Sequence, residues 1–291
     1  MQFVSILIAG IAIGSVYSLM ALAINIVFSA RRVVNFAQGD IVMLAGLVGV
    51  TLISAWAVPY ILGLLIVCIA TAALAVLIER VAIRSMATDE SSIAWILSIV
   101  SVAIILSNAA TLGFGTEPRP FPSLVSSRPI DVAGARIVPD HLATIVGAIA
   151  LMLIFNLLQE RTIHGKAMRA AARDPAMASM LGIPIKAYIV GAFAVSGVMA
   201  AMAGFLVGPL TFVSAQLGFA LGIKGFAAAA LGGLGSFRGA VVGGILLGVA
   251  ETLSATYLGS SVKNSVSLVA LCLILIFRPT GLFGESPVKK M

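Results

Sequence analysis

Long apolar segments separated by short polar ones make up most of this chain. Eight of them have the length and composition of membrane-spanning helices, which need about 20 mostly apolar residues. A ninth apolar segment, at 217–234, contains Lys224 and several glycines, so it is compatible with a helix that crosses, re-enters or lies partly in the membrane plane. The pattern predicts an all-α polytopic membrane protein with eight or nine transmembrane segments. The eight clear segments lie near residues 4–28, 40–57, 60–79, 93–113, 142–158, 187–208, 239–257 and 264–277.

The composition supports this class and indicates no second domain. Of the 291 residues, 60% are hydrophobic and 10% are charged, whereas an ordinary soluble domain carries about 25% charged residues. No Lys or Arg precedes the first apolar run, and the run contains no small-residue cleavage signal, so we interpret it as a retained span rather than a signal peptide. We therefore expect a single transmembrane domain over residues 1–291.

The positions of the basic residues predict the orientation. Cytoplasmic loops of membrane proteins are enriched in Lys and Arg, and most of the 18 basic residues fall on one side if the N-terminus is outside and the C-terminus inside. This arrangement needs an odd number of crossings, which favours nine, with residues 217–234 either crossing the membrane or paired with a half-span. The net charge of +7 then reflects cytoplasmic loops, and we expect no nucleic-acid partner. The residues assigned to the cytoplasm are Arg31, Arg32, Arg80, Arg84, Arg161, Lys166, Arg169, Arg173, Lys186, Arg238, Arg278, Lys289 and Lys290.

Two polar segments connect the spans on opposite sides. The external one, at 116–140, is rich in proline and too short to fold as a domain, so it is a docking surface, a lid or a plain connector. The cytoplasmic one, at 162–186, contains clear helix boundaries. Asp174 before Pro175 ends the helix that arrives from Gln159 and supplies the N-cap of a new helix.

A short helix at 175–181 is predicted after this boundary. Gly182 supplies a left-handed C-terminal cap, and Pro184 follows it. The helix is only about 10 Å long at 1.5 Å per residue, and isolated helices this short do not persist in water. Its partner is either lipid headgroups or another protein; the alternative is an ordinary basic loop that only sets topology. Three large apolar residues share one side of the helix, at i, i+3 and i+4: Met177, Met180 and Leu181.

Polar groups interrupt apolar segments in both halves of the chain. Asn35, Gln38 and Asp40 border the second span, and a broken helix of this kind is tolerated only where protein or water satisfies its backbone. Residues 224–244 have the same glycine-interrupted character. Paired interruptions in two halves of a membrane protein point to a transport path.

Glu251 and Lys224 are charged residues inside apolar segments of the second half. An ionised carboxylate near the middle of a span costs about 2.5–3.5 kcal/mol on insertion scales, so Glu251 must be paired, protonated or exposed to water. A structural hydrogen bond between helices and a place in the transport path are equally compatible with the pattern. The two residues are also candidates to pair with each other.

Glycines recur at four-residue spacing in several spans. Small residues at this spacing let the backbones of membrane helices approach closely. The pattern predicts tight packing seams. The pairs include Gly10/Gly14, Gly239/Gly243 and Gly244/Gly248.

Missing motifs restrict the chemistry of the chain. There is no G-x-x-x-x-G-K-[ST] phosphate-binding loop, so any ATPase must be a separate partner. His141 and His164 have no Cys or carboxylate companions at ligand spacing. We therefore expect no metal site, no cofactor and no catalytic residue.

The cytoplasmic segment resembles the coupling loop of ABC importer permeases. The order R-A-A, Asp-Pro and A-x-x-x-G-I in residues 169–183 is similar to the EAA-type loop of that family. In that family the short helix of the loop sits in a groove on a separate ATPase subunit and passes its movement to the membrane helices. The resemblance implies that the ATPase-coupling residues are Arg169, Ala170, Asp174, Pro175, Ala178, Leu181 and Gly182.

Other segments resemble the branch of this family that carries branched-chain amino acids and related compounds. NFAQGD at 35–40 is similar to N-F-A-H-G-E of that branch, residues 222–244 to its second-half glycine block, and FRPTGLFG at 277–284 to its C-terminal ending. Gln38 and Asp40 stand where the family often has His and Glu, which leaves the solute open. The candidates for the translocation path are Asn35, Phe36, Gln38, Asp40, Lys224 and Glu251.

These features predict the permease subunit of an ATP-binding-cassette importer in a bacterial inner membrane, for branched-chain or related amino acids and similar small polar compounds. The implied partners are two cytoplasmic ATPase subunits, a second homologous permease, an extracytoplasmic solute-binding protein and membrane lipid. The main alternative is a secondary transporter coupled to protons through Glu251, Asp40 or Lys224. The coupling loop argues against it, because ion coupling needs no docking helix. A membrane-embedded transferase or protease would need clustered His, Asp or Glu, which the chain lacks.

Overall fold

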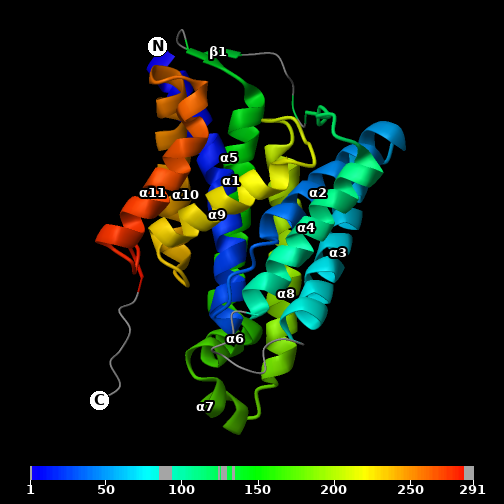
Figure 1. The fold of residues 1–291 in the computed structure, drawn as a ribbon, viewed down its shortest axis with the longest axis vertical. Helices are drawn as coiled ribbons and strands as arrows, with labels where there is room; N and C mark the ends of the chain where they lie inside the picture. The colour runs from blue at the N-terminus through cyan, green and yellow to red at the C-terminus, as the bar shows by residue number, and fades with distance from the viewer. Residues whose placement is uncertain (1, 85–93, 124, 126–129, 133–134, 285–291) are drawn as a thin grey trace.

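The structure, a computed structural model, is a bundle of long helices with smaller elements at its two ends (Figure 1). It describes residues 2–84, 94–123, 125, 130–132 and 135–284. Parts of the expected external loop and the basic residues Lys289 and Lys290 lie outside this range. The helices are α1 (Gln2–Arg31), α2 (Gln38–Val50), α3 (Tyr60–Ile78), α4 (Ala94–Phe114), α5 (Pro139–Arg161), α6 (Ile163–Arg173), α7 (Pro175–Met180), α8 (Ile185–Val207), α9 (Leu217–Gly232), α10 (Phe237–Tyr257) and α11 (Lys263–Phe277).

Eight helical segments of the described chain are long and apolar enough to cross a membrane. Two of them, α2 and α3, continue into a π-helical turn, at Thr51–Ala55 and Glu79–Ile83. The prediction of an all-α polytopic membrane protein is therefore confirmed. One local exception is a small antiparallel hairpin of β1 (Ile130–Val132) and β2 (Ala135–Ile137), in which Ile130 pairs with Ile137.

Helix α1 forms the centre of the bundle. It packs against α10, α8, α9 and α5, and its residues 16–27 are all buried. A helix that is apolar on every side either lies in a protein interior or spans a membrane, and the contacts of α1 place it in the interior of the bundle. Helices α4, α5 and α11 lie at the periphery and expose large apolar side chains, as lipid-facing helices do.

Helix α9 differs from the eight long helices in length and direction. It runs obliquely across the bundle, and it returns the chain between α8 and α10, which run in the same direction (Figure 1). Its 16 residues span about 24 Å at 1.5 Å per residue, which is less than the hydrocarbon thickness of about 30 Å. Within residues 217–234 the structure therefore shows an oblique helix that is too short to cross a membrane by itself.

Glycines make the contact between α1 and α10 possible. A Cβ atom placed on Gly248 would overlap the backbone of Gly14 and lie 2.7 Å from the carbonyl oxygen of Gly10. A Cβ atom on Gly244 would overlap Ser18. The Ser18 hydroxyl is shared across this seam, 2.9 Å from the Gly14 carbonyl oxygen and 2.8 Å from that of Val241 on α10. The glycine spacing predicted close packing at these positions, and the structure shows that α1 and α10 are the two helices that meet there.

Candidate functional site

Lys224 of α9 and Glu251 of α10 form a buried ion pair, so the structure joins the two charged residues of the second-half segments. Lys224 Nζ donates to Glu251 Oε1, and the Tyr17 hydroxyl of α1 donates to Glu251 Oε2 at 2.7 Å. The Glu251 residue is 0% exposed. Burying a carboxylate is tolerable only when its charge and hydrogen bonds are satisfied, and here both oxygens have partners. The arrangement can therefore hold three helices together.

The interruption before the second span forms a hydrogen-bonded corner. Asn35 Nδ2 donates to Gln38 Oε1 at 3.2 Å, and Asn35 Oδ1 accepts from the Ala37 amide at 3.2 Å. Gln38, which is fully buried, also exchanges hydrogen bonds with Ser196 of α8. Its Nε2 donates to the Ser196 carbonyl at 3.1 Å, and its Oε1 accepts from the Ser196 hydroxyl at 3.0 Å. The corner is thus tied to α8 by side-chain and backbone groups.

The two interrupted segments, predicted separately from the two halves of the chain, contact each other. A Cβ atom on Gly218 of α9 would lie 2.5 Å from Asp40 Oδ1, and one on Gly39 would overlap α9. Phe36, which is partly exposed, lies with its ring centroid 5.6 Å from that of Phe226. The candidate path residues therefore gather around α9, with the Asn35–Asp40 corner on one side and Glu251 on another.

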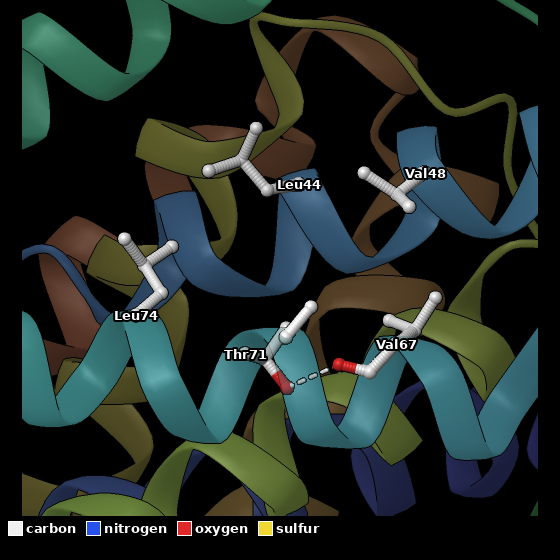
Figure 2. Close-up of a pocket in the computed structure, with 6 residues that line it drawn as sticks. Leu44, Val48, Val67, Thr71 and Leu74 are labelled. Carbon is white, nitrogen blue, oxygen red and sulfur yellow. Dashed lines mark hydrogen bonds between the residues drawn. The ribbon is translucent and has the colours of Figure 1, made fainter.

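A small apolar hollow lies beside this region, between α2 and α3. Its volume is about 120 Å³. Thr71 turns its hydroxyl back to the Val67 carbonyl oxygen at 2.8 Å, so the lining offers no free polar group (Figure 2). An amino acid needs partners for its charged groups, so this hollow does not fit such a cargo. None of the predicted site residues lines this hollow. The residues that line it are Leu44, Val48, Val67, Ala70, Thr71 and Leu74.

The predicted short helix of the cytoplasmic segment is present as α7. Asp174 Oδ1 accepts from the Met177 amide at 3.0 Å, which is an N-cap, and Gly182 has φ of +78°. The helix ends at Met180, one residue earlier than expected, with Leu181 as its C-cap. The predicted N-cap and the positive φ at Gly182 are therefore confirmed, and the C-terminal boundary is off by one residue.

One break in this segment was missed. The helix expected to arrive at Asp174 from Gln159 is divided at Thr162, where the backbone is extended. The Thr162 hydroxyl accepts from the Gly165 amide at 3.0 Å and so caps α6. A threonine three residues before that glycine was a usable N-cap signal. Arg169 and Ala170 consequently lie on α6, separate from the helix that carries Glu160.

Helix α7 presents an apolar face to the exterior. Met177 is 63% exposed, Met180 84% and Leu181 78%. On the bundle side, Ala178 is only 2% exposed. The helix lies at one end of the molecule and packs against α6 and α8 (Figure 1). A face of this kind is typical of a docking surface rather than of a free loop.

Two participants in these clusters were missed by sequence reasoning. Tyr17 and Glu251 are 234 positions apart, and Gln38 and Ser196 are 158 apart. No spacing rule connects residues at such separations. A tyrosine or serine inside an apolar span is also too common to indicate a site.

The comparisons with known proteins agree over nearly the whole chain. A family model described as branched-chain amino acid transport system / permease component matches residues 6–277. The high-affinity branched-chain amino acid transport system permease protein LivH of Salmonella typhimurium is 33% identical over 305 residues, covering 100% of this chain and 98% of its own. The corresponding protein BraD of Pseudomonas aeruginosa is 31% identical over 298 residues, covering 98% and 97%.

A solved structure shares the fold. PsaBC from Streptococcus pneumoniae, in complex with Fab, aligns with a TM-score of 0.53 and 16% sequence identity. The alignment covers 96% of this chain and 92% of that one. At this identity the likeness concerns the arrangement of helices alone.

Proposed function

Because this chain belongs to the family of branched-chain amino acid transport permease components, we propose that it forms the membrane path for branched-chain or related amino acids and similar small polar compounds. It is a multi-pass permease subunit of an ATP-binding-cassette importer and no enzyme. Asn35, Phe36, Gln38 and Asp40 line the proposed path. Lys224 and Glu251 brace α9 beside it.

The observation that carries the proposal is the exposed apolar face of α7. A helix of six residues with caps at both ends is rigid enough to transmit a push, and its methionines suit a groove on another protein. We propose that the protein that binds this face of α7 is a cytoplasmic ATPase subunit. Two such subunits, a second homologous permease and an extracytoplasmic solute-binding protein complete the transporter in the bacterial inner membrane.

A mechanical route leads from α7 to the proposed path. Helix α8 begins at Ile185, shortly after α7, and carries Ser196, which binds Gln38 through two hydrogen bonds. Ser196 lies eleven positions after Ile185, which is about 16 Å along the helix. When ATP closes the ATPases, movement of α7 shifts α8 and thereby the Asn35–Asp40 corner. The solute then leaves on the other side, because the two states differ in affinity for it.

Reconstitution tests the proposal. We expect the chain alone in liposomes to accumulate no amino acid, even with a proton gradient. With its ATPases, second permease and solute-binding protein, it takes up a branched-chain amino acid only when ATP is present. Met180→Glu should abolish co-purification of the ATPase and lower uptake at least tenfold, because it places a charge in the apolar contact.

The matched control for this test is on the same helix. Ser179→Glu adds the same charge at an exposed position that does not share the side formed by Met177, Met180 and Leu181. It should retain ATPase binding. Accumulation by the chain alone that collapses with an uncoupler would establish the proton-coupled alternative. Equal ATPase binding by both variants would remove α7 as the docking site.

The proposed orientation gives a second prediction. With the N-terminus outside, α7 lies in the cytoplasm and the loop after α4 lies outside. In a background without Cys68 and Cys272, a single cysteine from Ser179→Cys should react with a membrane-impermeant maleimide only in inside-out vesicles. One from Glu117→Cys should react only in intact cells. Labelling in the opposite pattern would reverse the orientation.

A further inference from the structure

Residues 279–284, which follow α11, fold back onto the end of α9. The Leu282 amide donates to the Leu231 carbonyl oxygen, and the Phe283 amide donates to that of Gly232, each at 2.9 Å. Leu231 and Gly232 are the last two residues of α9. The contact is therefore made by backbone groups, and it joins two segments about fifty positions apart.

These hydrogen bonds supply partners for carbonyl groups at the C-terminal end of α9. The last four carbonyl groups of a helix have no partner inside it, and a buried backbone group that is left unpaired costs about as much free energy as a lost hydrogen bond. The Ala229 carbonyl oxygen of α9 accepts a hydrogen bond from the amide of Gly233, the residue that follows the helix, at 2.9 Å. The carbonyls of Leu231 and Gly232 depend on the segment after α11.

A tight turn at residues 278–281 directs the chain after α11 toward the C-terminal end of α9. The Arg278 carbonyl oxygen accepts from the Gly281 amide at 2.8 Å, with Pro279 inside the turn, where proline is favoured. Gly281 has φ of +76°, and a Cβ atom there would overlap Gly233 and lie 2.6 Å from the Ala230 carbonyl oxygen. The neighbours are backbone atoms, which cannot turn aside as a side chain would. Only glycine fits at this position.

We propose that residues 279–284 are a positioning clamp, which holds the C-terminal end of α9 so that Lys224 stays against Glu251 and Tyr17. Lys224 lies eight residues before Gly232, about 12 Å along the helix, so α9 acts as a short lever. A shift of its clamped end moves Lys224. The consequence for transport rests on the proposed function, whereas the clamp itself does not.

Two shortened chains test the clamp directly. One ends at Gly284 and keeps it; the other ends at Arg278 and loses it. Both carry Ala230→Cys in a background without Cys68 and Cys272, since Ala230 is 7% exposed and its carbonyl oxygen lies 2.6 Å from a Cβ atom placed on Gly281. We expect N-ethylmaleimide to label the chain that ends at Arg278 at least tenfold faster. Equal labelling of the two chains would overturn the clamp.

Full-length variants test its effect on transport and cover the case in which the shorter chain does not accumulate. Gly281→Ala is compared with Gly259→Ala, because Gly259 also has positive φ, +103°, but has no atom within 4 Å of the added Cβ. Gly259 is the stricter control for backbone strain, because its φ of +103° and ψ of 155° lie in a region that is essentially restricted to glycine, whereas the clash with neighbouring backbone atoms is present only at Gly281. In the Ala230→Cys background, Gly281→Ala should speed labelling as the truncation does, and Gly259→Ala should not.

In the reconstituted transporter, Gly281→Ala should lower the maximal rate of ATP-driven uptake at least tenfold, with ATPase co-purification unchanged. A general folding defect would reduce both. Uptake by Gly281→Ala equal to that by Gly259→Ala would overturn the positioning role. If the unaltered chain shows no ATP-driven uptake, the proposed function fails, and the labelling comparison still decides whether the clamp exists.

Discussion

Replacing Gly248 by alanine should sharply reduce the amount of folded protein in the membrane. The added Cβ atom would overlap the backbone of Gly14 and approach the Gly10 carbonyl oxygen to 2.7 Å, so α1 and α10 must separate. Overpacking a core costs about 1–3 kcal/mol when side chains can shift, and backbone atoms shift less readily. The loss is therefore at the upper end of this range or above it, against a total stability of about 5–15 kcal/mol.

The amount of monodisperse protein extracted by a mild detergent measures this effect. We expect a fall of roughly tenfold or more, because losses of even 1–2 kcal/mol change abundance several-fold. Gly191→Ala is the control: Gly191 also lies inside a long helix, but no atom lies within 4 Å of its added Cβ. That change should be neutral or slightly stabilising, since alanine favours helix over glycine by about 1 kcal/mol. Normal yield of the Gly248 variant would show that the two helices are not held this closely.

Replacing Lys224 by methionine destabilises the protein by about 3–5 kcal/mol, the usual cost of leaving a buried charge without its partner. The carboxylate of Glu251 is fully buried, and Lys224 and Tyr17 occupy its two oxygens. With the lysine gone, the tyrosine hydroxyl alone cannot compensate the charge. Thermal unfolding of the purified protein in detergent measures the loss.

The double variant Lys224→Met/Glu251→Gln separates charge from packing. It removes both charges and leaves an amide that can still accept from Tyr17. We therefore expect it to be roughly 2 kcal/mol more stable than Lys224→Met alone, because a neutral pair avoids the uncompensated ion. Equal stability of the single and double variants would mean that the methionine fails for steric reasons, and the pair would no longer explain how α9 is held.

Local signals predicted several parts of the structure from sequence. The eight long spans follow from runs of apolar residues, and the caps of α7 follow from Asp174 and Gly182, which act on neighbours a few positions away. The break at Thr162 had such a signal too and was overlooked. The hairpin of β1 and β2 had a weak one, since each strand is only three residues long.

Other features depend on residues that are distant in sequence. The pattern at 217–234 allowed three placements, and the oblique course of α9 through the bundle depends on what surrounds the helix. The lack of a side chain on Gly39 lets α9 pack closely on one side. On another side α1 and Glu251 contact α9, and residues 279–284 bind its C-terminal end. The family resemblance identified the FRPTGLFG ending but not its role. That role depends on hydrogen bonds to α9, which is about fifty positions away in the sequence.

The sequence by itself determined the membrane class, the positions of the long helices, the caps of the short one and the lack of a nucleotide-binding loop, because each depends on composition or on neighbours along the chain. Tertiary structure alone decided that Lys224 meets Glu251 and Tyr17, that Gln38 binds Ser196, and that α9 lies obliquely under the clamp. From sequence, a buried charge or an unpaired carbonyl group predicts only that a partner must exist. Which group supplies it depends on how the helices pack.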